Sequence, residues 1–467
     1  MNGSRRFVNA KLHKNRNRYK NLTTPNYRQH ATHIMKLEDI YDIYLSHPVI
    51  TTDTRDCPEG SIFFALKGDN FDGNLFAHEA LAKGCAHAVV DNPDVAGSDG
   101  RMIYVSNVLY TLQELAHHHR MQLSLPVIQI TGTNGKTTTK ELVAAVLAEK
   151  FKVLSTQGNF NNHIGVPKTL LRLTADHQIA VIETGANHPG EIADLSKIVD
   201  ATSGLITNVG RAHLEGFGSF EGVLQTKLEL YRHLEQASNH FVFVNGDDDT
   251  LMSNLQSLKT VTYGLPGKGF DIEGEVVACN PCVVMRWRVS GGEWHEVTTN
   301  LVGSYNLHNM LAAVAVGIRY GVSEEQATHA LANYTPNNKR SQLQKTESNT
   351  LIVDAYNANP TSMKAAIENF NQIEHNNKFL ILGEMRELGE ASVEAHAEVV
   401  AQLQTLGFKN VWLVGNNFKE AAAAVGYRCF ESLEDVTHEL QEHPLTQHLI
   451  LVKGSNGTRL HQLPAYL

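Results

Sequence analysis

Residues 131–140, TGTNGKTTTK, have the residue types of a phosphate-binding loop but an irregular spacing. The common nucleotide-binding pattern is G-x-x-x-x-G-K-[ST], whereas Gly132 and Gly135 enclose only two residues here. In such a loop a lysine contacts the β- and γ-phosphates and the next hydroxyl binds Mg²⁺. We expect Lys136 and Thr137 to have these two tasks. The alternative is an ordinary strand–helix turn with a solvated lysine.

The segments on either side of this loop favour the phosphate-binding interpretation. PVIQIT, residues 126–131, is a short apolar run rich in β-branched residues, which predicts a buried strand. Residues 136–150 have apolar side chains at helical spacing, which predicts a helix that begins at the loop. The N–H groups and the positive end of that helix would then face an anion.

Further polar side chains follow other apolar runs in the same region. Glu183 comes directly after the run IAVI, and the carboxyl end of a strand next to a phosphate loop is a suitable place for a Mg²⁺ ligand. The turn TGANHPGEI and the segment LITNVGRAHLEGFGS then supply Asn187, His188, Asn208, His213 and Glu215. Each of these could be a cap or a turn residue, but their common position at strand ends predicts a single site.

Strand-like and helix-like segments alternate along the chain after Met35. This alternation predicts an α/β fold of parallel sheets covered by helices, with ligands at the carboxyl ends of the strands. A polar stretch with a proline, YTPNNKRSQ, is typical of a linker. A length of 467 residues allows about three domains. We expect them at 35–124, 125–339 and 340–467.

Composition excludes several classes of function. The net charge of −9 argues against a general nucleic-acid binder, and no apolar run approaches the ~20 residues that cross a membrane. Five scattered cysteines suit a reducing cytoplasm better than a disulfide framework. The pair in CNPC, Cys279 and Cys282, has no second pair at zinc-finger spacing and indicates a turn. The histidines of residues 117–119 fall in a predicted helix, where we expect them on the surface.

The first 34 residues differ from the rest of the chain. They contain eight lysines and arginines and no acidic residue, and they lack the apolar stretch of a secretory signal. We expect a disordered extension, or translation that starts at Met35, and a nucleic-acid-binding arm is the second alternative.

Seven separated motifs resemble, in order, those of the Mur ligases of peptidoglycan synthesis. They are GTNGKTTT, GNFNNHIGVP, ETGANHPGEI, TNVGRAHLEGFGS, GSYNLHNMLAA, DAYNANPTSM and LVKGS. The short G-x-x-G-K-T loop is that family's own variant, and the similarity covers residues 35–467. Within the family, DAYNANP and LGEMRELGE are similar to the members that add D-alanyl-D-alanine to UDP-N-acetylmuramoyl-tripeptide. TTDTR and GSIFFALKGDNFDG are similar to their UDP-sugar-binding domain.

The resemblance implies a three-domain fold. A central P-loop ATPase domain with a parallel sheet lies between an N-terminal UDP-sugar-binding α/β domain and a C-terminal Rossmann-like α/β domain. It also implies ATP-dependent amide synthesis in the cytoplasm by a monomer. ATP phosphorylates the terminal carboxylate of the tripeptide, and the amine of D-alanyl-D-alanine attacks the acyl phosphate. The phosphates of ATP and the carboxylate of the tripeptide are both anions, so the site needs the positive charge of Lys136, a helix N-terminus and Mg²⁺. We expect two Mg²⁺ ions.

The resemblance assigns the following site residues. For ATP they are Gly132, Thr133, Asn134, Gly135, Lys136, Thr137, Thr138, Asn306, Asn309, Arg340 and Asp354. For the metals they are Thr137, Glu183, His213 and Lys227, the last matching the lysine that the family carbamylates. Lys136, Lys227 and His213 are the predicted catalytic residues. Asn161 and Asn162 would face the peptide, and Thr54, Arg55, Asn70 and Asp72 the UDP end. In KGSNGT, Asn456 and Gly457 stand where a more basic stretch is expected.

Two other interpretations remain at this point. A sibling ligase, such as a folylpolyglutamate synthase or an enzyme that adds an earlier peptide residue, would share the ATP site but differ in the outer domains. A regulatory P-loop NTPase would lack synthetic chemistry, but neither Asn-Lys pair continues to the N-K-x-D pattern of guanine-binding switches.

Overall fold

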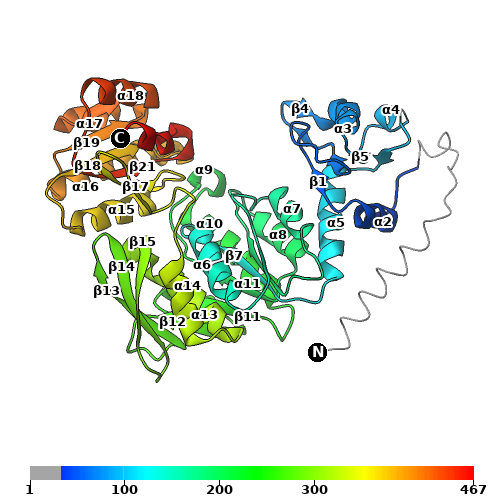
Figure 1. The fold of residues 1–467 in the computed structure, drawn as a ribbon, viewed down its shortest axis with the longest axis horizontal. Helices are drawn as coiled ribbons and strands as arrows, with labels where there is room; N and C mark the ends of the chain where they lie inside the picture. Colours follow the sequence, from blue (N-terminus) through cyan, green and yellow to red (C-terminus); the bar gives the residue numbers. More distant parts are fainter. Residues whose placement is uncertain (1–32, 98) are drawn as a thin grey trace. The chain divides into compact units, whose positions relative to one another are not determined.

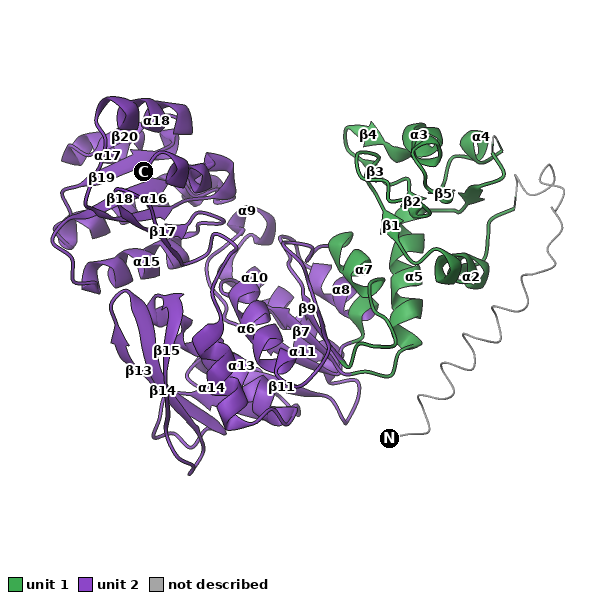
Figure 2. Cartoon of the chain, viewed as in Figure 1, with its two compact units in different colours: residues 1–125, 163–178, 198–200 green, residues 126–162, 179–197, 201–467 purple. Residues whose placement is uncertain are grey.

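The computed structural model describes residues 33–97 and 99–467, which fold into two compact units (Figure 2). Unit 1 comprises the described residues up to 125 together with residues 163–178 and 198–200, and unit 2 comprises residues 126–162, 179–197 and 201–467. The expectation for the first 34 residues falls almost wholly outside the described residues. The domain boundaries 35–124, 125–339 and 340–467 stay predictions.

Unit 1 is built on a four-stranded parallel sheet with the order β1-β2-β5-β6 (Figure 1). Its apolar runs form the predicted strands because their β-branched and aromatic side chains, such as Ile62, Phe63 and Val90, are buried in the core of the unit. The strands are β1 (Ile50–Thr51), β2 (Ile62–Phe64), β5 (His87–Val90) and β6 (Met102–Tyr104), with a small hairpin of β3 (Lys67–Gly68) and β4 (Phe71–Asp72). The helices are α2 (Leu37–Ser46), η3 (Gly73–Phe76), α3 (Ala77–Ala82), α4 (Pro93–Ala96), α5 (Val108–Met121) and α7 (Gly165–Leu170).

The expectation that the three histidines of residues 117–119 are surface residues is wrong for one of them. His119 is buried on α5, where its Nε2 lies 2.9 Å from the carbonyl oxygen of Leu173 and its Nδ1 lies 3.1 Å from the hydroxyl of Tyr41. The buried face of α5 packs against α2 and α7, so this histidine is a hydrogen-bonded core residue. No metal role follows.

Unit 2 contains a nine-stranded sheet with the order β15-β14-β13-β12-β11-β10-β7-β9-β8. From β8 to β13 all neighbours are parallel, as the alternation of strands and helices predicts. The parallel strands are β7 (Val127–Thr131), β8 (Val153–Ser155), β9 (Ile179–Glu183), β10 (Ser203–Ile206), β11 (Phe241–Asn245), β12 (Lys259–Gly264) and β13 (Ile272–Cys279).

Helices cover both faces of this sheet. On one face α6 (Lys136–Ala148), α13 (Leu307–Arg319) and α14 (Glu324–Asn333) enclose the largest core, with Ile128 and Ile130 of β7. On the other face Gln129 donates to Ser196 of α8 (Glu191–Val199), and Gly204 packs against Leu230 of α11 (Glu229–Leu234). The remaining short elements are α9 (Leu214–Phe217), α10 (Phe220–Lys227), α12 (Asp249–Met252) and η4 (Ser304–Asn306).

The sheet also has an antiparallel extension that the sequence interpretation did not include. β14 (Cys282–Val289) and β15 (His295–Val302) pair antiparallel with β13 and with each other. The turn expected at CNPC joins β13 to β14. In β14 the buried residues Val283, Met285 and Trp287 alternate with more exposed ones, which is the period-two pattern of such a strand.

The C-terminal part of unit 2 has a six-stranded sheet with the order β16-β17-β21-β18-β19-β20, parallel except for the β16–β17 pair. Its strands are β16 (Gln342–Lys345), β17 (Thr350–Asp354), β18 (Lys378–Gly383), β19 (Val411–Val414), β20 (Arg428–Phe430) and β21 (Leu449–Lys453). Two apolar cores lie on its two faces. The helices are α15 (Pro360–Gln372), η5 (Gly389–Ala391), α16 (Ser392–Thr405), η6 (Asn416–Phe418), α17 (Lys419–Val425), α18 (Leu433–Glu442), η7 (Asn456–Thr458) and η8 (Leu460–Ala465).

Candidate active site

The loop between β7 and α6 has the predicted strand–loop–helix geometry. Gly132 and Gly135 have φ of 140° and 79°, a backbone region that favours glycine. A side chain at position 132 would also collide with Thr207. Both the backbone conformation and the space at this position therefore require glycine. Thr138 is buried in the first turn of α6. The helix α6 therefore begins directly at the end of the loop, which is the arrangement of a phosphate-binding loop.

The ammonium of Lys136 is folded back onto the loop. Its Nζ donates to the carbonyl oxygens of Gly132, at 2.8 Å, and Thr133, at 3.0 Å. Burial lowers the pKa of Lys136 to about 8; nearby Arg340 also lowers it, and Glu183 opposes the shift. A cation destabilised in this way gains from any phosphate that comes within reach.

Glu183 is the centre of the predicted metal site. Its carboxylate is 1% exposed, and its Oε1 accepts hydrogen bonds from the Thr137 hydroxyl at 3.1 Å and from Asn161 Nδ2 at 2.7 Å. Its Oε2 is buried and has no hydrogen-bond partner among the described residues. A buried carboxylate oxygen without a partner is costly, which fits a cation as its missing partner.

His213 begins α9 with a left-handed backbone, at φ 51°. Such a conformation is uncommon for a residue with a Cβ and marks local strain. Its Nδ1 lies next to a carboxylate oxygen of Glu387, which also has a positive φ, 62°. Burial lowers the pKa of His213, with Glu387 acting in the opposite direction and Lys136 adding to the decrease.

Lys227, the last residue of α10, is only 2% exposed. Its Nζ lies 5.4 Å from the ring centroid of Phe217, and no described residue accepts a hydrogen bond from it or pairs with it. Burial lowers its pKa to about 7, Lys136 adds to the decrease, and Glu191 and Glu229 oppose it. A large fraction of this amine is therefore neutral near pH 7.

The predicted adenine-side asparagines are connected to the phosphate loop. Asn309 Nδ2 donates to Asn306 Oδ1 at 2.8 Å, and Asn309 Oδ1 accepts from Thr139 of α6 at 3.0 Å. A side chain at Gly135 would collide with Asn309. The two asparagines thus lie along one side of the loop.

Two more predicted ATP residues lie in the linker and in the C-terminal part of unit 2. The guanidinium of Arg340 lies 4.0 Å from the ring centroid of Tyr356, and its charge affects the pKa of Lys136. Asp354, at the end of β17, pairs with the buried Lys453 at 2.5 Å. Arg340 is therefore in reach of the phosphate loop, whereas Asp354 is held by a lysine of the LVKGS motif.

One contact that the sequence interpretation missed joins the loop to α15. Asn134 N donates to Asn208 Oδ1 at 3.0 Å, and Asn359 Nδ2 donates to Asn134 Oδ1 at 2.7 Å. Asn359 also caps α15 through Ser362 N. The signal was present as the Asn-Pro pair that begins a helix within DAYNANP, but a cap alone predicts no contact with residue 134.

The residues predicted for the UDP end lie in unit 1, except for the peptide-facing pair. Arg55 is 89% exposed and forms an ion pair with Asp53 at 2.7 Å. Thr54 accepts from Lys83 through its carbonyl oxygen at 2.8 Å, and Asp72 caps η3 through Asn74 N at 2.9 Å. Asn70 is exposed, as is Asn162 of the predicted peptide-facing pair. Their roles stay predictions.

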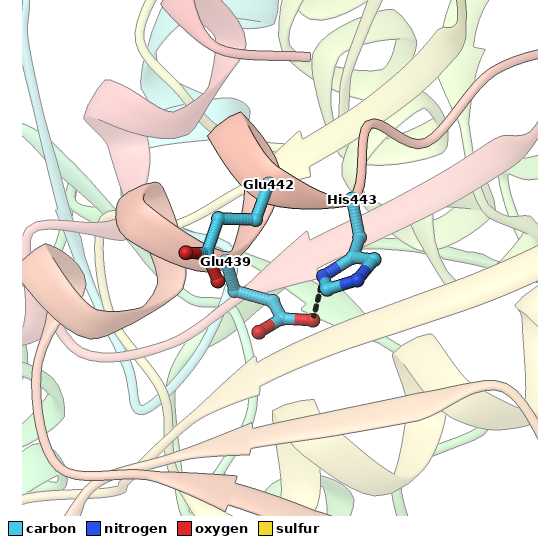
Figure 3. Close-up of side chains that lie close together, drawn as sticks. All are labelled: Glu439, Glu442 and His443. Carbon is cyan, nitrogen blue, oxygen red and sulfur yellow. Dashed lines mark ion pairs between the residues drawn. The ribbon is translucent and has the colours of Figure 1, made fainter.

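One other group could suggest a metal site: Glu439, Glu442 and His443 at the end of α18 (Figure 3). His443 Nδ1 lies 3.0 Å from Glu439 Oε1, but both carboxylate oxygens of Glu439 also accept hydrogen bonds from Arg428. The guanidinium already supplies the positive charge. Within residues 33–97 and 99–467, the five cysteines are unpaired and no helix has the length and apolarity to span a membrane.

Comparison with protein families matches three models to this chain. The Mur ligase middle domain matches residues 130–317, the Mur ligase glutamate ligase domain matches residues 339–456, and the Mur ligase family catalytic domain matches residues 48–120. The UDP-N-acetylmuramoyl-tripeptide–D-alanyl-D-alanine ligase of Bacillus subtilis is 34% identical over 429 residues, which cover 89% of this chain and 92% of that protein. The chain belongs to the Mur ligase family.

Solved structures agree with this membership. MurF from Acinetobacter baumannii is similar to this Mur ligase at a TM-score of 0.80 and 32% identity, with 89% of this chain and 92% of that one covered. MurF from Thermotoga maritima, solved in complex with ADP, has a TM-score of 0.79 at 26% identity, with 90% and 96% covered. The predicted α/β fold of three Mur ligase domains with parallel sheets is confirmed.

Proposed function

We propose that this Mur ligase uses ATP to join D-alanyl-D-alanine to UDP-N-acetylmuramoyl-tripeptide, releasing ADP and phosphate. The observation that supports this most is the near full-length similarity to ligases of that name, at 34% identity over 92% of the Bacillus subtilis protein. A carboxylate is a poor acyl donor, and phosphorylation converts it to an acyl phosphate with a good leaving group. The amine of the dipeptide then displaces phosphate and forms the amide.

ATP binding is proposed at the β7–α6 loop. Residues 132–138 would surround the phosphates, with Lys136 leaving its two carbonyl partners for the β- and γ-phosphate oxygens. Asn306 and Asn309 would contact the adenine side, and Arg340 and Asp354 would approach from the linker and β17. The Thermotoga maritima relative was solved in complex with ADP, which supports nucleotide binding by a protein of this fold.

The residues present fit Mg²⁺ in the proposed site. Glu183 Oε2 lacks a partner in the described structure, and the Thr137 hydroxyl lies 3.1 Å from the other oxygen of the same carboxylate. Thr137 and Glu183 would hold a first ion, and His213 and a modified Lys227 would hold a second. When bound, the ions neutralise the negative charge of the phosphates and the substrate carboxylate.

We propose that Lys227 is carbamylated in the working enzyme. A buried ammonium with no acceptor is unfavourable, and its lowered pKa, about 7, supplies neutral amine for reaction with CO₂. The nitrogen attacks the carbon of CO₂ and loses a proton, which gives a carbamate with one negative charge. The cation would thereby become a carboxylate-like metal ligand at the same position.

The two ends of the UDP substrate are assigned to different parts of the chain. Thr54, Arg55, Asn70 and Asp72 are proposed for the UDP end, and Asn161 and Asn162 for the peptide. Asn161 already donates to Glu183, so a peptide carboxylate beside it would lie next to the proposed metal. We further propose a monomer that works in the cytoplasm without nucleic-acid or membrane partners, a location supported by ATP use and five unpaired cysteines.

The test is phosphate release by the purified protein, with each substrate omitted in turn. Full release should require ATP, UDP-N-acetylmuramoyl-tripeptide and D-alanyl-D-alanine together, and the product mass should equal tripeptide plus dipeptide minus water. Efficient use of single L-amino acids in place of the dipeptide would contradict the assignment and favour a sibling ligase.

A further inference from the structure

Glu141 is an acidic residue of the phosphate-loop helix α6 to which none of the roles above is assigned. Its side chain is 22% exposed. Its Oε2 accepts hydrogen bonds from the Tyr334 hydroxyl at 2.6 Å and from Asn338 Nδ2 at 2.7 Å, and its Oε1 lies 3.3 Å from Lys140 Nζ. Tyr334 directly follows α14 and Asn338 lies farther along the linker to β16. This one carboxylate therefore connects α6 to the linker.

Asn338 extends the contact to Arg340, because both ends of its amide are used. While Nδ2 donates to Glu141, Oδ1 accepts the backbone N–H of Arg340 at 3.2 Å. A carboxylate accepts hydrogen bonds and donates none, so exchange of the amide nitrogen and oxygen would place two acceptors face to face. Glu141 thereby fixes the orientation of the side chain that receives the Arg340 backbone.

The backbone on both sides of Arg340 is strained. Lys339 and Ser341 have φ of 61° and 47°, in the left-handed region that residues with a Cβ rarely adopt. Such conformations persist only where the surrounding structure holds them. Ser341 Oγ lies 2.9 Å from the Tyr305 hydroxyl, and the Lys339 carbonyl accepts from the N–H of Ala355 at 3.2 Å. These contacts hold the linker from η4 and β17, and the α6 contact holds it from the phosphate loop.

The guanidinium of Arg340 depends on this backbone for its position. Its Cζ lies 4.0 Å from the ring centroid of Tyr356, and within the described part of the chain it donates no hydrogen bond. Burial lowers the pKa of Lys136, and the charge of Arg340 lowers it further, so the guanidinium lies close enough to act on the phosphate loop. With no side-chain partner to fix it, the charge is placed by the linker that carries it.

We propose that Glu141 is a positioning residue that holds Arg340, through Asn338, at the phosphates of the bound nucleotide. The inference rests on the proposed function, which assigns Arg340 to ATP. Lys136 is the first residue of α6 and Glu141 lies in the next turn, so one helix would set the place of both cations. Charges that are already in position stabilise a transferring phosphoryl group without the cost of moving them.

The first experiment compares Glu141→Ala with Glu149→Ala. Glu149 directly follows α6, is 27% exposed and pairs with His329 of α14 at 3.0 Å, so it is a matched acidic residue away from the linker contact. Glu141→Ala should lower kcat/KM for ATP by about 10-fold to 100-fold, because misplacing a reacting partner by about 1 Å can cost 10²-fold. KM for the UDP substrate and for the dipeptide should not change. Glu149→Ala should behave as wild type.

A double-mutant cycle separates positioning from a merely structural role. If Glu141 acts through Arg340, Glu141→Ala in an Arg340→Ala background should lower kcat/KM for ATP by less than about 2-fold further. Glu141→Gln keeps an acceptor for Asn338 and should restore most of the activity. Asn338→Asp keeps the acceptor for Arg340 but faces Glu141 with a second carboxylate, and it should reproduce the loss seen in Glu141→Ala.

Binding of the unreactive β,γ-methylene analogue of ATP, measured by calorimetry, makes the possible failures distinguishable. If the wild type ligates nothing, the proposed function is wrong, and analogue affinity still tests the contact: weaker binding by Glu141→Ala supports it, and equal binding overturns it. If the wild type ligates, an unchanged kcat/KM in Glu141→Ala or a fully multiplicative loss in the double variant overturns the positioning role. An equal loss in Glu149→Ala overturns it too, because the effect would then come from helix charge in general.

Discussion

At the scale of single residues, the half-buried Lys136 and the buried Lys227 dominate the electrostatics of the site. Lys136 is held by two loop carbonyls and Lys227 has no acceptor in the described structure, and the charge of Lys136 lowers the pKa of Lys227. Two cations that repel each other in this way are unfavourable until anions arrive. ATP phosphates would satisfy the first lysine, and carbamylation would remove the positive charge of the second.

Lys136→Ala is expected to abolish ligation. Loss of a preorganised charge on the transferring phosphoryl group should cost about 10²-fold or more in kcat. Binding of the UDP substrate should persist, because its UDP end is assigned to residues of unit 1. Steady-state phosphate release and calorimetric titration of the UDP substrate measure the two effects. Wild-type turnover would remove the phosphate-loop interpretation.

Lys227→Arg is expected to be nearly inactive, because guanidinium stays charged and cannot form the carbamate. Wild-type activity should rise with pH through about 7, where the amine loses its proton, and should depend on bicarbonate in that range. A small carboxylic acid should restore part of the rate of Lys227→Ala by occupying the vacant space. Lys197→Arg, an exposed lysine of α8, is the control. Full activity of Lys227→Arg would exclude the carbamate.

Lys227→Met should lose activity but gain stability in bicarbonate-free buffer. Between about pH 7 and 10.5 the unfolded chain holds a proton that the native amine has lost, so wild-type stability rises with pH across this range. The penalty of the buried ammonium is therefore complete below pH 7 and disappears toward pH 10.5. The increase in Tm of the variant should follow this course, at roughly 1 °C for each 1 kcal/mol in a chain of this length. An increase in Tm that does not change with pH would contradict the assigned cause.

At the scale of elements, helix α15 is attached to the phosphate loop through its first residues. Asn359 caps the helix with its oxygen and donates to Asn134 with its amide nitrogen. Asn359→Asp keeps the cap but replaces the donor by a carboxylate next to Asn134 Oδ1. We expect near wild-type Tm and a raised KM for ATP. Asn359→Ala should also lose about 1 kcal/mol of stability with the cap. Equal ATP kinetics in wild type and Asn359→Asp would show that the contact has no role in nucleotide binding.

The sequence predicted the elements of the site better than their contacts. Buried parallel strands such as β7 and β9 are continuous apolar runs, and the apolar residues of α6 recur at helical spacing. Both patterns can be recognised in a short stretch of sequence. Buried and exposed side chains alternate along β14 and β15. These strands were not predicted because no helix separates them, whereas the prediction rested on alternating strands and helices. His119 and Asn359 were misjudged or missed because their partners lie 54 and 225 residues away, a relation that no local pattern contains.

At the scale of the whole molecule, the basic N-terminal segment is expected to be dispensable. The backbone N–H of Met35 donates to the carbonyl of Tyr104, at the end of β6, so the ordered contacts of unit 1 include this residue. A chain that begins at Met35 should match the full chain in Tm and kcat. Thermal unfolding and ligation assays of the two proteins side by side give the comparison. A large loss in the shortened chain would assign the segment a role in the enzyme.

The antiparallel β14–β15 extension contains none of the residues assigned to ATP, metal or substrate. The turn between β14 and β15, at residues 290–293, is exposed and contains two glycines. Exposed turns of small residues tolerate inserted chain, because the flanking strands keep their pairing. An epitope or a fluorophore-binding peptide placed after Gly291 should therefore leave ligation intact. This Mur ligase thus has an attachment point for imaging or immobilisation on a part of its fold that its chemistry does not use.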